Sequence, residues 1–512
     1  MNYRLVINRL GLLFVVLSIT QLVTALWAAG QLAAGHEGES QALWSLLMSA
    51  GLALVAGGIM WLTTRGGPPS LGRREALLLV AASWLIGAAL AGAPFCIWAR
   101  LMPADAPDHI LGSPVNAYFE AMSGLTTTGA TVIVGIPDVP RSLLLWRATT
   151  HWLGGLGIVV LFVAVLPSIG VGGKRLFRVE APGPEPEGVH PHIRETARIL
   201  WLIYLGLTVA EVIALRLAGM SWYDAVCHTF ATLATGGFST VDTSVGGFSQ
   251  LAVTIIITVF MVLAGVNFGL YYQLMRGRIG SVWRDAELRT YLAILFVGCA
   301  IVVISIINEP IVLTTGEQLE PSVGAAIRHG VFTTVSIQTT TGFCTADFNK
   351  WSFIPKATLI LLMFVGASAG STGGGIKVIR VLVAFKIMVA ELERAFRPNV
   401  VRAVRVGQIA VSPELRLATI AFVLGHLLLF GAGAALMMVF EQSQGISVTT
   451  AASASVATLC NIGPGLGAVG AVENYAWFGP LSKITMSLLM ALGRLEVFAI
   501  LVLFVPRFWR ST

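Results

Sequence analysis

Four short stretches rich in threonine and glycine recur along the chain at intervals of roughly 110 residues. Each follows a short, moderately apolar segment and precedes a connection and a long apolar run. Threonine hydroxyls and main-chain carbonyls are uncharged oxygen ligands, and such ligands can replace the water around a monovalent cation. The stretches are Thr126–Gly129, Leu233–Gly236, Thr339–Gly342 and Cys460–Gly463. The spacing predicts four copies of one unit.

The composition indicates a membrane protein. The 512 residues are 56% hydrophobic and 12% charged, whereas soluble domains carry about 25% charged residues. The first apolar run keeps Arg9 near its start and lacks a small-residue cleavage site, so it is expected to be a retained helix. The runs long enough to cross a bilayer are Leu5–Ala28, Gln41–Thr63, Glu75–Trp98, Ser142–Leu166, Ala197–Ala218, Gln250–Leu274, Leu288–Ile307, Phe353–Phe385, Leu415–Phe440 and Ala476–Val505.

The charge pattern predicts how these spans are oriented. The net charge of +7 arises from basic residues in alternate connections, so it indicates topology and no nucleic-acid partner. Acids such as Glu317 and Glu320 gather in the other connections. Both termini are therefore expected in the cytoplasm, and the four Thr/Gly loops are expected to open to the outside. The five cysteines have no paired spacing, which predicts neither a disulfide framework nor a metal site.

The predicted architecture is an all-α polytopic membrane protein with four pseudo-symmetric repeats around a central pore. Each repeat contains a span, a half-helix too short to cross, a Thr/Gly loop and a second span. The half-helices are expected at Pro114–Gly124, Trp222–Leu233, Val323–Gln338 and Val448–Cys460. The expected units are an accessory transmembrane hairpin at 1–70 and pore repeats at 71–180, 181–284, 285–406 and 407–512.

A pore explains the loops better than local structure does. A single Thr/Gly stretch is compatible with a turn or a small-residue helix contact, but four at the same place in four span pairs favour a shared function. Glycine lets successive carbonyls point at one axis without a side chain in the way. Each half-helix also directs its partially negative C-terminal end at the membrane centre, which favours a cation.

The eighth span contains a candidate gate. Five glycines fall within residues 366–375, and each costs a helix about 1 kcal/mol relative to alanine. The span is therefore expected to break in mid-membrane, although a tight small-residue helix crossing is the alternative. Arg494 lies deep in the last span, where a cation is costly and usually functional. Its alternative role is a buried ion pair with Glu496 or another acid.

These residues resemble those of the Trk-type potassium uptake family, within the superfamily that also contains Ktr, plant and fungal transporters. The resemblance rests on 126–131, 234–239, 339–343 and 461–465 and extends over essentially the whole chain. It implies a potassium filter made of the glycine and the two residues before it in each loop. The implied ligands are Thr127, Thr128, Gly129, Ala234, Thr235, Gly236, Thr340, Thr341, Gly342, Asn461, Ile462 and Gly463. A glycine in the first loop implies potassium, because relatives with serine there favour sodium.

The resemblance also implies a gate and partners. The implied gating loop comprises Gly370, Ser371, Thr372, Gly373, Gly374, Gly375 and Lys377, with Arg494 propping it closed below the filter. A homodimer and a cytoplasmic TrkA-like nucleotide-binding regulatory subunit are implied, with nucleotide bound only by that partner. The basic linkers 174–198 and 386–405 are candidate docking surfaces, or they simply set topology. The location implied is the bacterial inner membrane.

The predicted function is potassium uptake through a channel-like pore driven by the membrane potential. The alternatives are a sodium-permeating pore or a cation-coupled potassium symporter of the same fold, and, less favoured, a polytopic membrane enzyme. An enzyme would need ionisable groups converging at one depth, and these are sparse and scattered. The chain is therefore not expected to be an enzyme, and no phosphate-binding loop of Walker spacing is found, so it is not expected to hydrolyse ATP. His151, His228 and His329 flank the half-helices and are expected at the membrane interface.

Overall fold

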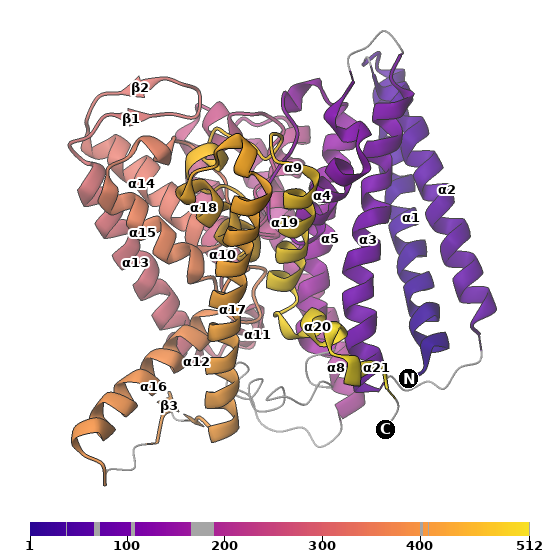
Figure 1. Ribbon diagram of the computed structural model, residues 1–512. Coiled ribbons are helices and arrows are strands. Elements are labelled where there is room, and N and C mark those ends of the chain that lie inside the picture. The colour runs from indigo at the N-terminus through magenta and orange to yellow at the C-terminus, as the bar shows by residue number, and fades with distance from the viewer. Residues whose placement is uncertain are drawn as a thin grey trace.

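The computed structural model describes residues 1–36, 38–65, 72–103, 108–164, 189–399, 403–407 and 409–510, with side chains omitted at 158–164, 189–194 and 196. Long helices run side by side through the middle of the molecule, and both termini lie at one end (Figure 1). We call this end the terminal face. The short hairpin of β1 (Ile311–Val312) and β2 (Gln318–Leu319) lies at the other end, which we call the outer face.

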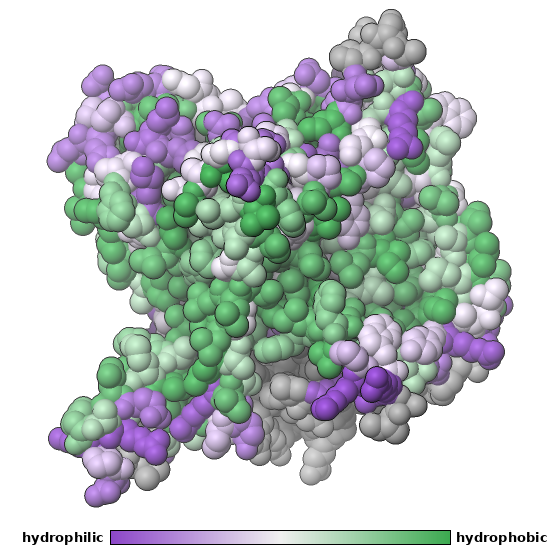
Figure 2. Space-filling view, viewed as in Figure 1, coloured by the Kyte–Doolittle hydropathy of each residue, from purple (hydrophilic) through white to green (hydrophobic). Residues whose placement is uncertain are grey.

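On the face shown in Figure 2, a broad apolar band lies between two more polar ends. In the described part of the chain, six helices are long and apolar enough to cross a membrane, or eight if each of two bent pairs counts as one span. The two other predicted spans are the α5 helix, Arg141–Ala164, which runs into residues that are not described, and a run broken at 365–377. The fold is that of a polytopic helical membrane protein.

The first two helices form the expected accessory hairpin, α1 (Tyr3–Ala33) and α2 (Glu39–Thr63). Gly11 and Gly57 let the two backbones approach closely, because a Cβ at either would lie within 3 Å of the other's carbonyl oxygen. The hairpin packs on α3 and α5, at the edge of the bundle (Figure 1). Buried Glu39 accepts the backbone N–H of Ser142 at 3.2 Å and so ties the hairpin to α5.

Each of the four units that follow contains one helix that ends at a Thr/Gly loop, here called a pore helix. The pore helices are α4 (Pro114–Leu125), α9 (Trp222–Leu233), α14 (Val323–Gln338) and α18 (Val448–Leu459). The helices around them are α3 (Arg73–Leu101), α5, α8 (Val189–Leu217), α10 (Leu251–Ala264), α11 (Phe268–Met275), α13 (Ala286–Ile306), α15 (Phe353–Phe364), α16 (Val378–Phe396), α17 (Pro413–Phe440) and α19 (Pro480–Arg494). The pore helices agree with the predicted half-helices to within one residue.

The remaining elements are small and lie at the terminal face. They are α12 (Ile279–Trp283), the antiparallel hairpin β3 (Arg405–Val406) and β4 (Ile409–Ala410), α20 (Phe498–Leu501) and α21 (Pro506–Trp509). Helix α16 projects away from the bundle at this face (Figure 1). The predicted boundaries at 70/71 and 180/181 lie outside the described residues, whereas 284/285 falls at the start of α13 and 406/407 within the β3–β4 hairpin.

Three spans are broken, although the sequence predicted a break in only one. The span expected at Gln250–Leu274 bends by 93° between α10 and α11, and that expected at Ala476–Val505 bends by 114° after α19. Both were predicted to be continuous, and both predictions are wrong. The eighth span breaks as expected, because residues 365–377 form a loop between α15 and α16. All three breaks lie on the terminal-face side of the pore helices (Figure 1).

Candidate functional site

The four pore helices end in the same backbone arrangement. The residue after each helix cap adopts positive φ, as at Thr127 (φ 52°) and Asn461 (φ 57°). The following N–H then reaches back across the last turn, which is the Schellman motif. These bonds join the N–H of Thr128 to Ser123 O, Gly236 to Ala231 O, Thr341 to Ser336 O and Ile462 to Ala457 O, at 2.8, 2.8, 2.9 and 2.8 Å. Each Thr/Gly loop therefore leaves its pore helix in the same direction.

This geometry corrects the alignment of the second loop. Gly129, Gly342 and Gly463 each lie two residues after the first positive-φ residue and have positive φ themselves. In the second loop that position belongs to Gly237 (φ 77°), and not to Gly236. The structural equivalent of Thr127, Thr128 and Gly129 is thus Thr235, Gly236 and Gly237, and Ala234 is the helix cap. The predicted match of Ala234, Thr235 and Gly236 is wrong by one residue.

Three of the positive-φ positions hold threonine, which is unusual. A β-branched residue is disfavoured in the left-handed region, and such strain tends to persist at functional sites. The hydroxyl of Thr127 and the side-chain carbonyl of Asn461 are buried and accept no hydrogen bond within the described chain. The hydroxyl of Thr340 instead accepts the N–H of Gly374 at 2.6 Å. These oxygens lie at the inner end of the four loops.

The four loops close into a ring. A Cβ added to Gly129 would overlap the carbonyl oxygen of Gly236 in the second loop. A Cβ added to Gly237 would likewise overlap Thr341 O in the third loop, and one added to Gly342 would overlap Ile462 O in the fourth. The ring closes where a Cβ on Gly463 would lie 2.7 Å from Thr128 O in the first loop. Each glycine is needed both for its backbone conformation and for the space beside its neighbour's carbonyl.

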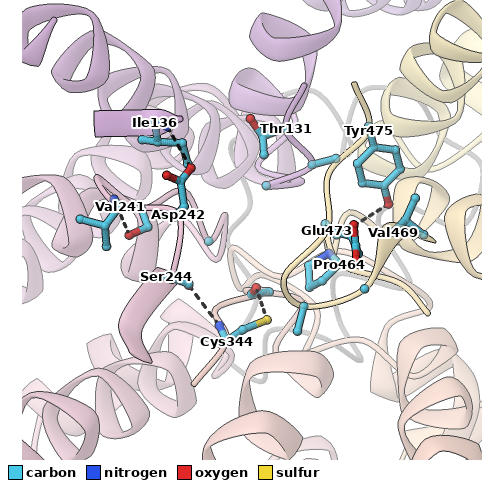
Figure 3. Close-up of a pocket in the computed structure, with 18 of the residues that line it drawn as sticks. Thr131, Ile136, Val241, Asp242, Ser244, Cys344, Pro464, Val469, Glu473 and Tyr475 are labelled. Carbon is cyan, nitrogen blue, oxygen red and sulfur yellow. Dashed lines mark hydrogen bonds between the residues drawn. The ribbon is translucent and has the colours of Figure 1, made fainter. Parts of the chain in front are cut away.

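Hydrogen bonds join the loops just outside this ring (Figure 3). The first and second loops meet where Ile136 N–H donates to Asp242 (2.9 Å), and the second and third where Cys344 N–H donates to Ser244 (3.2 Å). Asn349 exchanges two hydrogen bonds with the backbone of Gly467, which links the third and fourth. The fourth and first loops are joined by the N–H of Tyr475, which donates to Thr131 O at 2.8 Å.

A hollow on the outer side of the ring is lined by all four loops. It contains about 520 Å³ of empty space, including its open mouth, and its lining includes the ring glycines Gly129, Gly237, Gly342 and Gly463. Asp242 and Glu473 stand on opposite sides of it (Figure 3). The hollow therefore leads from the outer face to a ring of main-chain oxygens.

A buried ion pair holds the first two loops together. Arg147 on α5 contacts Glu120 on α4 at 2.6 Å, with 3% and 0% of the two side chains exposed. Glu120 also accepts from the Thr131 hydroxyl and from Val132 N–H, and Arg147 donates to Ser239 O at 3.0 Å. Both charges are thus compensated, as burial requires. The sequence analysis did not single out this pair.

The loop of residues 365–377 lies next to the ring, on the side of the terminal face. Thr372 donates to Leu233 O at the end of α9 (2.8 Å), and Gly374 N–H donates to the hydroxyl of Thr340 (2.6 Å). A Cβ on Gly374 would overlap Cys460 O at the end of α18. The loop therefore reaches the C-terminal ends of three pore helices through Thr372 and Gly374, whereas Gly370 lies beside Asn267 at the α10–α11 break.

The breaks in the other two spans contact this loop or the helix α16 that follows it. The N–H of Ser368 donates to Gly265 O, and Phe268 N–H donates to Gly370 O, both at 3.0 Å. The α10–α11 break thus supplies backbone partners to the loop. After α19, Glu496 (φ 57°) forms an ion pair with Arg380 of α16 at 2.5 Å.

Arg494 contacts the loop and not Glu496. Its guanidinium donates to Thr372 O at 2.7 Å, and its Nε and Nη2 atoms are buried without a hydrogen-bond partner in the described structure. Lys377 donates to Gly373 O from within the loop. Two buried cationic side chains therefore lie beside the loop, below the ring. The predicted alternative, a pair between Arg494 and Glu496, is not formed.

Glu287 fastens the loop to α13. Its carboxylate accepts the N–H of Ala369 in the loop at 2.7 Å and that of Ile379 in α16 at 3.2 Å, so one side chain holds both the loop and the helix that follows it. Ile379 lies in the first turn of α16, where an anion also satisfies free N–H groups. The side chain is 5% exposed. The only sequence signal for this role of Glu287 was an acid at the start of an apolar span. Such an acid usually does no more than interact favourably with the helix dipole.

The three histidines singled out in the sequence lie inside the protein. His151, His228 and His329 are all buried. His151 contacts Gly124 O (2.9 Å), His228 contacts Ser239 (3.0 Å) and His329 contacts Thr345 (3.0 Å). They support the ends of pore helices and the loops. Within the described residues no group of three His, Cys, Asp or Glu side chains could hold a metal ion.

Comparison with known proteins gives the family. A family model described as TrkH, cation transport protein, matches residues 100–511. The chain belongs to this family. It is 37% identical over 513 residues to the Trk system potassium uptake protein TrkH of Escherichia coli strain K12, and 38% identical over 519 residues to that of Halomonas elongata. Both alignments cover 100% of each chain.

A solved TrkH-family structure has the same fold. The crystal structure of the potassium transporter TrkH from Vibrio parahaemolyticus matches with a TM-score of 0.85 at 34% identity, and the match covers 100% of both chains. The relationship thus includes the accessory hairpin as well as the four units. The relatives named here are potassium uptake proteins and a potassium transporter.

Proposed function

We propose that this chain takes up potassium ions through a pore at the centre of the four loops. The observation that carries the proposal is the closed ring, in which each loop's glycine lies against the next loop's carbonyl. A bare cation resists entering hydrocarbon by tens of kcal/mol, and a ring of carbonyl oxygens compensates by replacing its water. The names of the TrkH-family relatives support potassium as the ion.

The filter that we propose follows the corrected alignment. Its ligands are Thr127, Thr128, Gly129, Thr235, Gly236, Gly237, Thr340, Thr341, Gly342, Asn461, Ile462 and Gly463. The unpartnered oxygens of Thr127 and Asn461 support ligand roles at the inner end of this filter. Each pore helix directs the partially negative end of its dipole at the ring, which favours a cation.

The loop at 365–377 is proposed as the gate, and its seated position as the closed state. Gly374 lies under the filter, bonded to Thr340. Arg494 and Lys377 add positive charge in the ion's path, and Arg494 also holds the loop through Thr372 O. Opening requires that the loop leave this seat.

A passive pore suffices for accumulation. An inward cation gains about 2.3 kcal/mol per 100 mV, and about 1.4 kcal/mol corresponds to a tenfold ratio. A potential near 180 mV therefore sustains roughly a thousandfold gradient. Such a pore must close when the potential falls, which gives the gate its purpose.

We further propose that the protein is a homodimer controlled by a cytoplasmic nucleotide-binding subunit of the TrkA type, with both termini on that side. Much of the basic linker 174–198 lies outside the described residues. In the other linker, α16 extends from the bundle and Lys386 donates to Arg405 O at 2.7 Å. Neutralising basic residues of 386–405 is expected to abolish co-purification with the subunit, and intact binding would exclude this docking surface.

Potassium uptake in a bacterial strain lacking its own uptake systems tests the central proposal. The parent is expected to restore growth at low potassium, and Gly342→Ala to abolish it, because the new Cβ overlaps Ile462 O. Gly431→Ala is the matched control, since a Cβ there on α17 meets nothing within 4 Å. Equal uptake by both variants at equal membrane abundance would contradict the filter. Reversal potentials in mixed potassium and sodium separate a potassium pore from a sodium pore.

A further inference from the structure

The carbonyl groups of the four ring glycines are not equivalent. The hydroxyl of Tyr475 donates a 2.6 Å hydrogen bond to Gly463 O in the fourth loop (Figure 3). Across the described chain, the carbonyls of Gly129 and Gly237 accept no hydrogen bond, and that of Gly342 accepts only a weak one from the Cys344 thiol at 3.6 Å. All four glycines line the outer hollow. One of four oxygens at the outer end of the ring is therefore engaged by a phenol.

The backbone differs at the same place. The φ angle of Gly463 is 96°, whereas those of Gly129, Gly237 and Gly342 are 82°, 77° and 82°. The junction between the fourth and first loops is also the loosest, because a Cβ on Gly463 would lie 2.7 Å from its neighbour's oxygen while the other three would overlap theirs. The hydrogen bond thus coincides with a distinct position of the fourth glycine.

Tyr475 is built to hold this position. It is 2% exposed, and its ring packs against Phe119 of α4 and Phe478 at centroid distances of 5.6 and 5.9 Å. Its own N–H donates to Thr131 O in the first loop at 2.8 Å. The residue therefore bridges the fourth and first loops with its backbone and fixes the Gly463 carbonyl with its hydroxyl.

We propose that Tyr475 is a specificity-determining residue of the filter. A carbonyl that already accepts a strong hydrogen bond is a weaker and less movable ion ligand. An ion at the outer end of the ring meets three carbonyls of full strength and a fourth that is attenuated and fixed. Lower ligand strength and a fixed ring diameter both disfavour the smaller sodium ion. This inference rests on the proposed filter.

Tyr475→Phe is the direct test, because it removes the hydroxyl and keeps the packing and the backbone bond. The sodium-to-potassium permeability ratio, measured from reversal potentials in proteoliposomes, is expected to rise by up to about fivefold, the factor that one neutral hydrogen bond typically contributes. Tyr118→Phe is the matched control. The hydroxyl of Tyr118 donates to Leu85 O of α3 at 3.2 Å, away from the ring. The sodium-to-potassium permeability ratio of Tyr118→Phe is therefore expected to equal the parent's.

A fluorotyrosine at position 475 gives a second, independent measurement that keeps the phenol. Fluorination makes the hydroxyl a stronger donor, so the ratio is expected to fall below the parent's. Ratios for Tyr475→Phe and the fluorotyrosine protein that both equal the Tyr118→Phe value would overturn the role of Tyr475 while leaving the pore intact. A parent without potassium flux would overturn the pore and this inference together.

Discussion

Replacing Glu287 with glutamine is expected to release the proposed gate. The change keeps the size of the side chain and removes the charge that accepts the N–H groups of Ala369 and Ile379 at 2.7 and 3.2 Å. A hydrogen bond to a charged group contributes about 1 kcal/mol more than a neutral one, so two such bonds lose about 2 kcal/mol. The ratio of unseated to seated loop is then expected to rise about thirtyfold.

Potassium efflux from proteoliposomes without any regulatory subunit measures this ratio, because in the proposed mechanism only molecules with an unseated loop conduct. Glu39→Gln is the matched control. Glu39 is equally buried and also accepts a backbone N–H, that of Ser142 at 3.2 Å, but it lies in the accessory hairpin. Basal efflux is expected to rise for Glu287→Gln alone. Equal efflux from the two variants would refute the view that this carboxylate holds the loop.

Two further substitutions test the charges around the ring. Arg494→Ala is expected to raise basal cation efflux, because it removes both the hydrogen bond to Thr372 O and a positive charge from the proposed ion path. Arg494→Lys is the control that keeps the charge. An efflux from Arg494→Ala no higher than the parent's would argue against the gate. Arg147→Met is expected to lower thermal stability in detergent, since an uncompensated buried Glu120 costs about 3–5 kcal/mol. Adding Glu120→Gln should recover part of that loss, and an unchanged melting temperature for Arg147→Met would contradict it.

The sequence predicted the pore helices well because their signals are local. The segment Trp222–Leu233 was predicted to the residue, as was Val323–Gln338. Each starts after a serine cap, Ser221 or Ser322, and ends at a Thr/Gly stretch that cannot continue a helix. Short amphipathic helices with clear starts and stops need no tertiary information.

The register of the second loop could not be found in this way. Gly236 and Gly237 are adjacent, and either can adopt positive φ, so only the position of the helix cap decides between them. The other three loops each have a single glycine at the equivalent position, so their sequences do not show which of the two adjacent glycines matches it. The correction moves the proposed ligand set by one residue and replaces Ala234 with Gly237.

The helix breaks and the residues that hold the gate depend on contacts between distant segments. Gly265 alone does not break a helix, and Val497 has no sequence feature that would do so. The first break is stabilised by the loop through Gly265 O, and the second accompanies the pair between Glu496 and Arg380. Sequence periodicity shows which face of a helix is apolar, but it does not show which side chains of distant segments will contact that helix.

The seated loop satisfies backbone groups that broken helices cannot satisfy themselves. Gly265 O, Phe268 N–H and Leu233 O all bond to it. When the loop departs, each must find another partner, since an unmet buried polar group costs about 1–3 kcal/mol. In the proposed gating mechanism that partner is water. Release of the loop and hydration of the passage are then one event, and solutes that withdraw water from narrow spaces should keep the pore closed.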